Sequence, residues 1–185
     1  MTPEGADPLT DALRVRKGAI VRAWLARMLR AYPDHTSRFL DREQDPFRNP
    51  VGHTLKEALA ALFDELLGEM NAEKVTPLLD GIVRIRAVQD FTASQAVAFP
   101  FHLKMVLRET VGDQFRRDPE GNGLAALDDR IDQMALLAFD LFMRCRESIY
   151  EVRANETRRR LYLLERMHVK NLRRTDEGHG APSRP

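Results

Sequence analysis

The five histidines and the single cysteine are the residues from which a typical zinc site in this chain would be built. A zinc site needs them at characteristic spacings, such as two histidines one helical turn apart or histidine combined with a pair of cysteines. His35, His53, His102, His168 and His179 form none of these patterns. The sequence therefore predicts no metal site.

Motifs for catalysis are absent as well. The sequence contains no Gly-x-Ser-x-Gly motif, no phosphate-binding glycine loop and no dinucleotide fingerprint. Cys145 falls on the apolar face of a predicted helix, and helical geometry turns its neighbours Arg144 and Arg146 away from that face. This placement is typical of a buried structural thiol. We predict no catalytic residue and no enzymatic activity.

His102 lies in an apolar segment beside Phe99, Pro100 and Phe101. A histidine there could ligate haem or sense pH, but a half-buried histidine bonded to a backbone carbonyl is more common. We predict no cofactor. The alternative function is a small-molecule binding module with an apolar pocket, for which haem is the least favoured ligand. Its pocket would be lined by Trp24, Phe63, Phe99, Phe101, His102, Phe139 and Phe142.

Polar residues gather within Ile82–Val97, where one predicted helix ends and the next begins. Thr92 and Gln95 have the spacing of a capping box, which starts a helix. Arg86 and Asp90 precede them, and two interpretations remain open. The junction could bind an anion or a partner carboxylate through Arg86 and the amides near Thr92. Alternatively, Asp90 pairs with Arg86 across the turn as part of a structural network. This second interpretation is the favoured one.

Apolar residues recur with a helical period along the chain, and no segment alternates as a strand does. We expect helices over residues 9–31, 34–40, 53–70, 73–88, 92–115 and 124–170. Pro33 ends the first helix, and Pro100 predicts a kink or break in the fifth. Thr76 and Pro77 are expected to cap the fourth, and Gly81 to mark a close helix contact. The predicted fold class is therefore all-α.

The longest predicted helix, 124–170, has two dissimilar halves. Apolar residues at steps of three and four predict a buried face in the first half. Basic residues outnumber acidic ones ten to four from Arg144 to Arg174, so the second half is a basic arm on a mildly acidic body. An apolar seam continues into the arm and predicts a companion helix. The candidate partner-binding or dimer residues are Arg158, Arg159, Arg160, Leu161 and Leu164.

Length and composition suit one soluble domain with an extension: 185 residues, 43% hydrophobic and 31% charged. We expect a disordered N-terminus (1–8), a helical domain (9–152), the arm (153–174) and a disordered tail (175–185). No signal peptide and no membrane span is found in the sequence, so a cytoplasmic location is expected. Nucleic-acid binding by the arm arginines is less favoured than binding to a protein partner.

Three stretches carry a resemblance to a known family. They are NPVGHTL at Asn49–Leu55, RIRAVQDFTASQAV at Arg84–Val97 and AFDLFMRCRESIYEVRANE at Ala138–Glu156. In these stretches the sequence resembles the N-terminal domain of RsbR-type proteins, the RsbT co-antagonists, in the RsbRD variant. The resemblance covers about Leu9–Leu164 in order. It implies a globin-like, non-haem, all-helical sensory domain that dimerises.

In full-length relatives, the last helix leads into a STAS domain that assembles stressosomes and meets a kinase. The present sequence ends after the helix, so we expect neither that domain nor its phosphorylatable site. The resemblance thus implies the sensory or adaptor half alone. We predict a non-enzymatic signalling protein of the stress-response type, which forms a homodimer and meets a protein partner through its C-terminal helix.

Overall fold

The computed structural model describes the helices and most of their connections. The described residues are 8–43, 45–89, 91–111 and 122–178, with side chains of the last helix described over 123–168. Every regular element in these residues is an α-helix, so the all-α prediction with its long C-terminal helix is confirmed. The globin-like arrangement stays a prediction. The chain divides into two compact units, Met1–Cys145 and Arg146–Pro185.

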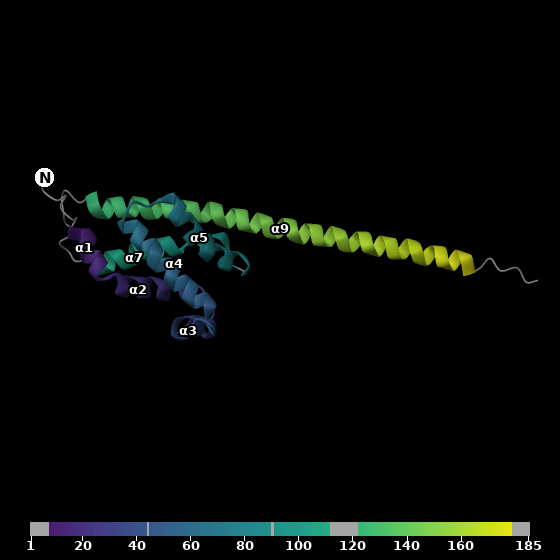
Figure 1. Cartoon of the computed structure of the whole chain (residues 1–185), viewed down its shortest axis with the longest axis horizontal. Helices are drawn as coiled ribbons and strands as arrows, with labels where there is room; N and C mark the ends of the chain where they lie inside the picture. Colours follow the sequence, from purple (N-terminus) through teal and green to yellow (C-terminus); the bar gives the residue numbers. More distant parts are fainter. Residues whose placement is uncertain (1–7, 44, 90, 112–121, 179–185) are drawn as a thin grey trace, which may run out of the picture. The chain divides into compact units, whose positions relative to one another are not determined.

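Figure 1 labels the larger helices. The helices are α1 (Pro8–Val15), α2 (Lys17–Leu29), α3 (Asp34–Arg42), α4 (Pro50–Leu67), α5 (Ala72–Ala87), α7 (Phe99–Thr110) and α9 (Asn122–Gly178), with the short α6 (Ala93–Val97), which carries no label in the figure, between α5 and α7. The expected short helix after Pro33 is α3. All of α1 to α7 belongs to the first unit, together with the part of α9 that ends at Cys145.

The first predicted helix, 9–31, is two helices because the chain bends at Arg16. This residue has φ −95° and ψ 4°, outside the helical region. If the helix were straight, Arg16 and Lys17 would lie on its buried face, between the apolar residues that precede and follow them. In the bend, an Nη1–H of Arg16 donates to the Thr110 carbonyl at 2.8 Å. Lys17 Nζ lies 2.6 Å from the Asp64 carboxylate, so both charges stay at the surface.

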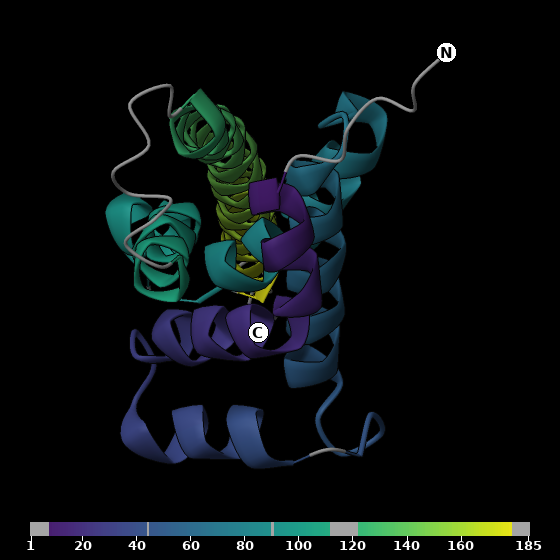
Figure 2. The ribbon, with the colours of Figure 1, turned by 90° about the vertical axis from the view of Figure 1, so that its left-hand side faces the viewer.

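Helix α2 is the central element of the first unit, where it packs against α1, α3, α4 and α7. Figure 2 shows α3 alongside α2, with α4 at an angle to both. Trp24 on α2 is fully buried, and its indole N–H donates to the Phe99 carbonyl at 2.6 Å. The two rings stack with centroids 6.4 Å apart. This contact joins α2 to the start of α7.

Pro100 divides the helix that the sequence predicted over 92–115. The predicted capping box is present: Thr92 Oγ1 accepts from the Gln95 N–H at 3.3 Å, and Gln95 Oε1 accepts from the Thr92 N–H at 3.0 Å. It starts the short α6, and α7 follows after a single residue. Pro100 then lies in the first turn of α7, where its missing N–H removes no helical bond. The last predicted turn falls largely on 112–121, outside the described residues.

Asn49, 2% exposed, holds the connection between α3 and α4. Its Oδ1 accepts from the Gly52 N–H at 2.8 Å and so caps α4. Its Nδ2 donates to the carbonyls of Leu40 and Glu43, both at 3.0 Å. A Cβ on Gly52 would lie 2.6 Å from the Leu40 carbonyl oxygen, so a larger residue does not fit. This cap starts α4 three residues before the predicted position.

Two details of α5 differ from the prediction. The N-cap is Asn71, whose Oδ1 accepts from the Glu73 N–H at 2.8 Å, and not Thr76. Pro77 therefore lies inside the helix, where it removes one backbone hydrogen bond. The close helix contact expected at Gly81 is wrong, because no neighbouring heavy atom lies within 4 Å of the position that a Cβ would take.

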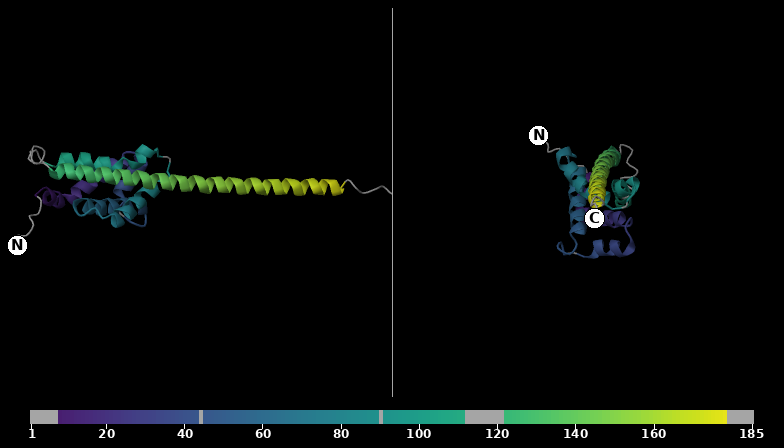
Figure 3. Two further views of the ribbon diagram at one scale, coloured as in Figure 1. Left: turned by 90° about the horizontal axis from the view of Figure 1, so that it is seen from above. Right: turned by 90° about the vertical axis from the view of Figure 1, so that its right-hand side faces the viewer.

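The first part of α9 is buried along the face that the apolar spacing predicted. Its buried residues are Leu127, Ile131, Met134, Ala135, Ala138, Leu141 and Phe142. Figure 3 shows α7 beside this part of α9. Ion pairs join the two helices, with Lys104 2.7 Å from Asp132 and Arg108 2.5 Å from Asp128.

Arg130 connects α9 to the end of α4. Its Nη1 group donates to the carbonyls of Leu66 at 2.8 Å and Gly68 at 2.7 Å. Carbonyls at a helix C-terminus have no partner within the helix, so this arginine supplies the missing donors.

Helix α9 is longer than the predicted 124–170. It begins at Asn122 and ends at Gly178, so it includes residues 175–178, which we expected in a disordered tail. The remainder of the tail and residues 1–7 lie outside the described residues.

Replacing Asn49 by alanine should lower the free energy of unfolding by about 2–3 kcal/mol, because it removes a helix cap and leaves two carbonyl acceptors without their donor. Urea unfolding followed by the fluorescence of Trp24, the single tryptophan, measures the loss. The matched control is Asn71→Ala, which removes an exposed cap alone and should cost about 1 kcal/mol. Equal losses in the two variants would contradict the role given to the Asn49 amide.

Candidate functional site

The aromatic residues expected around a ligand pocket are divided between core and surface. The buried ones are Trp24, Phe63, Phe99 and Phe142. Phe101 and Phe139 are 47% and 42% exposed, because each points away from the buried face of its helix. These two residues therefore belong to no enclosed apolar pocket. His102, the other member of the set, lines a cavity of different composition.

Arg86, in the last turn of α5, is 1% exposed and is the only buried charged side chain among the described residues. Its Nη2 group donates to the Gln95 carbonyl at 3.0 Å. Its Nε and Nη1 groups are buried and have no hydrogen-bond partner in the described part of the chain. Asp90, the predicted partner of Arg86, lies outside the described residues. The junction thus brings Arg86 and Gln95 together and leaves two donor groups unused.

Two aromatic rings enclose the Arg86 guanidinium. Its central carbon lies 4.6 Å from the centroid of Phe91 and 5.7 Å from that of Tyr32. The two rings contact each other edge to face, with centroids 5.0 Å apart. The negative faces of aromatic rings attract a cation, and each contact contributes roughly 0.5–2 kcal/mol. Such contacts offset only part of the free energy that it costs to remove a charge from water.

The residues around Arg86 are brought there by three breaks in the helices. Tyr32 follows the end of α2, where Pro33 prevents the helix from continuing. Phe91 lies in the turn between α5 and α6. Gln95 lies in the short α6, whose last carbonyls have no donor within the helix. One of these carbonyls is therefore free to accept from Arg86.

Burial lowers the pKa of the Arg86 guanidinium, and the neighbouring Tyr32 acts against this shift. The pKa of the Tyr32 phenol is raised, chiefly by burial, while Arg86 and Gln89 act in the opposite direction. Arginine keeps its proton at neutral pH because its ordinary pKa is far above neutrality. The junction therefore holds a positive charge and a neutral phenol side by side, with little access to water.

A cavity of about 310 Å³ lies around His102. Its lining residues are Arg27, Arg30, Ala31, Gln95, Ala98, His102 and Met105. The Nδ1 atom of His102 is buried without a hydrogen-bond partner among the described residues. The pKa of His102 is lowered, first by burial and then by the positive charges of Arg86, Arg27 and Arg30. The imidazole is thus neutral at neutral pH and lies in a region of positive potential.

A second cavity, of about 440 Å³, adjoins the first. Its lining residues are Ala31, Tyr32, Pro33, Thr36, Gln89, Phe91 and Gln95. Ala31 and Gln95 line both cavities, which therefore lie on either side of these two residues. Basic side chains line the first cavity. In the second cavity, Tyr32 and Phe91 form an aromatic wall. Arg86 lies directly behind this aromatic wall.

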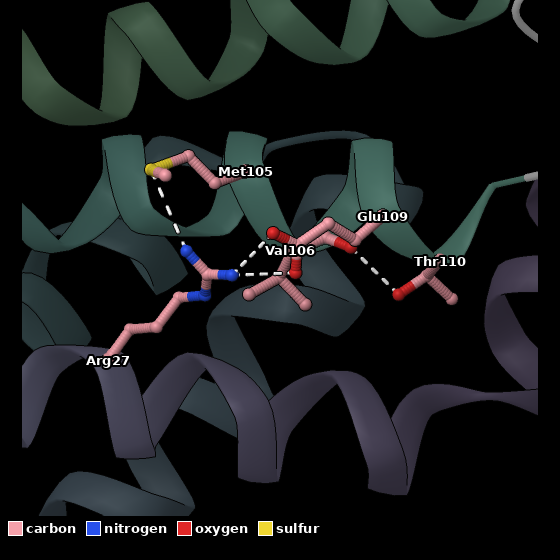
Figure 4. Close-up of polar contacts among 5 residues, drawn as sticks. All are labelled: Arg27, Met105, Val106, Glu109 and Thr110. Carbon is pink, nitrogen blue, oxygen red and sulfur yellow. Dashed lines mark hydrogen bonds and ion pairs between the residues drawn. The ribbon is translucent and has the colours of Figure 1, made fainter.

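Arg27 and Arg30, which the sequence analysis did not single out, differ in their partners. Figure 4 shows Arg27 reaching from α2 to α7. Its Nη2 lies 2.5 Å from the Glu109 carboxylate, and its Nη1 donates to the sulfur of Met105 at 3.8 Å. Arg30 follows α2, is exposed and forms no ion pair with the described residues. The available signal was two arginines three residues apart at the end of an apolar helix, just before Tyr32.

The residues predicted to bind a partner lie on α9 in the second unit, and all are exposed. They are Arg158, Arg159, Arg160, Leu161 and Leu164. Arg160 pairs with Glu156 one turn earlier, at 2.5 Å. The guanidinium of Arg166 lies 5.8 Å from the ring of Tyr162, another exposed contact of the same helix.

The described residues offer neither a metal site nor a membrane-spanning helix. No group of three or more histidine, cysteine, aspartate or glutamate side chains there could hold a metal ion. No helix there is long and apolar enough to cross a membrane. Cys145 is half-buried, and its thiol pKa is raised by burial and then by Asp80. A raised pKa keeps the thiol protonated, so it is a weak nucleophile at neutral pH.

The fold defines an all-helical domain with a long C-terminal helix. Residues 18–157 match the family described as the RsbT co-antagonist protein rsbRD N-terminal domain, and the chain belongs to this family. The resemblance seen in the sequence is therefore confirmed. The family is one of sensory and regulatory domains. No curated protein and no solved structure matches the chain.

Replacing Arg86 by methionine should leave the free energy of unfolding unchanged within about 1 kcal/mol, or raise it. Methionine keeps much of the packing volume and removes a charge whose burial is incompletely compensated. Urea unfolding measures the change. Arg86→Lys is the contrasting variant, because a strongly hydrated ammonium cannot spread its charge over the two rings. A methionine variant that loses more than about 2 kcal/mol would show that Arg86 is a net stabilising residue.

The free energy of unfolding should fall as the pH drops below about 6.5, the ordinary pKa of histidine. Between that value and the lowered pKa of folded His102, the unfolded chain binds a proton that the folded chain does not. The unfolded state therefore gains stability on acidification, by at most about 1.4 kcal/mol per pH unit for one group. His102→Gln should lack this component. Parallel stability curves for the variant and the natural chain between pH 5 and 7 (roughly the histidine range) would contradict the assignment.

Proposed function

We propose that this protein is a non-enzymatic sensory or adaptor domain, in the cytoplasm, that acts through dimerisation and through a protein partner bound by its C-terminal helix. Its membership of the RsbRD N-terminal domain family supports the sensory and regulatory part of this proposal. The part of α9 in the second unit supports the choice of an interaction surface.

The observation that carries the proposal is a group of exposed apolar side chains on α9. The group consists of Leu161, Tyr162, Leu163, Leu164 and Met167, each between 55% and 62% exposed. Apolar area of this extent on one stretch of helix is unfavourable in water and is usually covered by another protein surface. Most helices in proteins are stabilised by packing of their apolar face, so a helix with these exposed residues would gain stability from a partner surface.

We propose a second copy of the chain as the first occupant of this surface. Thr157, Leu161 and Leu164 follow one another at steps of four and three, the spacing of a coiled-coil seam. Two α9 helices would cover each other's leucines along this seam. The exposed arginines Arg158 and Arg159 lie off this seam, Arg159 on the opposite side of the helix, and both would remain available.

Those arginines favour an acidic protein surface as the further partner. Arg158 and Arg159 are exposed and adjacent, and they add to the positive charge of the segment. Exposed charges of one sign steer a partner of the opposite sign and speed association. Nucleic acid is the less favoured partner, because phosphate contacts would have to come from this one short stretch of helix.

The double variant Leu161→Glu/Leu164→Glu should dissociate the dimer, because paired helices would bring carboxylates together in the seam. Sedimentation equilibrium at tens of micromolar (roughly the range of a weak association) measures the mass. The expected result is a dimer for the natural chain and a monomer for the variant.

The control is Asn155→Glu/Arg159→Gln, which changes the net charge by the same amount on the opposite side of the helix. It should remain a dimer. A natural chain that sediments as a monomer, or a control that dissociates equally, would contradict the proposed seam.

A further inference from the structure

Among the described residues around the two adjoining cavities, positive charges exceed the negative charges that face them. Arg27 is neutralised by Glu109, but Arg30 and Arg86 have no carboxylate partner among the described residues. Among the described residues, none of those that line either cavity carries a carboxylate. Native proteins rarely leave a buried guanidinium with unused donors unless an ion, water or ligand satisfies them.

We propose that the two cavities beside Gln95 form one binding site for a small organic carboxylate with an aromatic or apolar body, and that Arg86 and Arg30 are its charged contacts. The inference deepens the proposed sensory function, since this ligand would be the signal. Binding itself depends on the first unit alone and is measured apart from dimerisation.

The unused donors indicate an oxyanion. Arg86 offers the N–H groups of Nε and Nη1, and the buried, unpartnered Nδ1 of His102 donates in one of the two neutral tautomers. A carboxylate has two oxygens that accept several hydrogen bonds, and arginine–carboxylate bonds are among the strongest in proteins. In a space with little water these charge-assisted bonds gain further strength.

The walls indicate that the anion carries an apolar body. Tyr32, Pro33 and Phe91 line the larger cavity, and an inorganic ion would leave these surfaces uncovered. The cavity volumes of about 310 and 440 Å³ suit a small organic molecule. The carboxylate would lie toward the arginines, and the body would lie against Phe91 and Tyr32.

Gln95 controls access to Arg86 in this arrangement. Arg86 is 1% exposed, whereas Gln95 is exposed and lines both cavities. The side chain of Gln95 is held by its capping contact with Thr92, a bond between exposed groups. In the proposed site, displacing this side chain would give a ligand access to the guanidinium, which lines neither cavity, while the bond that Arg86 donates to the Gln95 carbonyl remains.

Titration of the full chain with benzoate, an aromatic carboxylate, tests the site. With ¹⁵N label in the arginine side chains, NMR follows the Nε–H signal of Arg86, which is assigned by its absence in Arg86→Met. The expected result is saturable binding of benzoate with a shift of that signal, and binding of the neutral isostere benzamide that is at least roughly tenfold weaker.

Two variants and one control locate the ligand. Arg86→Met should weaken benzoate binding roughly ten- to hundredfold, the equivalent of one charge-assisted bond, and Arg30→Gln should weaken it less. Arg22→Gln removes an exposed arginine of α2 that lines neither cavity, and should bind benzoate as the natural chain does. Circular dichroism of each variant confirms that it is folded.

Several outcomes would overturn the inference. They are equal binding of benzoate and benzamide, no binding of benzoate to the folded chain, unchanged binding to folded Arg86→Met, and binding of inorganic phosphate at Arg86 without binding of benzoate. The last result would replace the organic carboxylate with an inorganic anion. Sedimentation of the same samples separates these failures from a failure of dimerisation, because neither Arg86 nor Arg30 lies in the second unit.

Discussion

The break in the helix at Pro100 is the constraint on which the organisation of the first unit depends. Proline cannot donate a helical hydrogen bond, so α6 stops and α7 begins anew with Pro100 in its first turn. Two carbonyls beside the interruption then serve other elements. Gln95 accepts from Arg86 of α5, and Phe99 accepts from Trp24 of α2. The break between α6 and α7 therefore lies between a contact to the core of α2 and a contact to the end of α5.

In the proposed site, Arg86 would serve binding at some expense of stability. A guanidinium in a space that water scarcely reaches is stabilised here by one carbonyl and two aromatic rings. An apolar residue would fill the same volume without losing hydration. The retention of a charge at such a place is easier to understand if it serves binding. A basic cavity around His102 and an aromatic wall at Phe91 lie next to this charge.

Helix α9 changes character along its length without changing its secondary structure. Up to Cys145 its apolar face is covered by the helices of the first unit, and ion pairs such as Lys104 with Asp132 fix it to α7. In the second unit the apolar residues around Leu161 are exposed.

The sequence by itself determined the helices, the buried face of α9, the capping box at Thr92 and the family, because these depend on periodicity and short-range hydrogen bonds. It missed the bend at Arg16 and misplaced the cap of α5, because several polar residues there compete for the same local role. Only the tertiary structure decided that Phe101 lies at the surface and that Arg30 and His102 share a cavity. These features depend on which distant elements meet, and a side chain's spacing along its own helix carries no information about the helix that it will face.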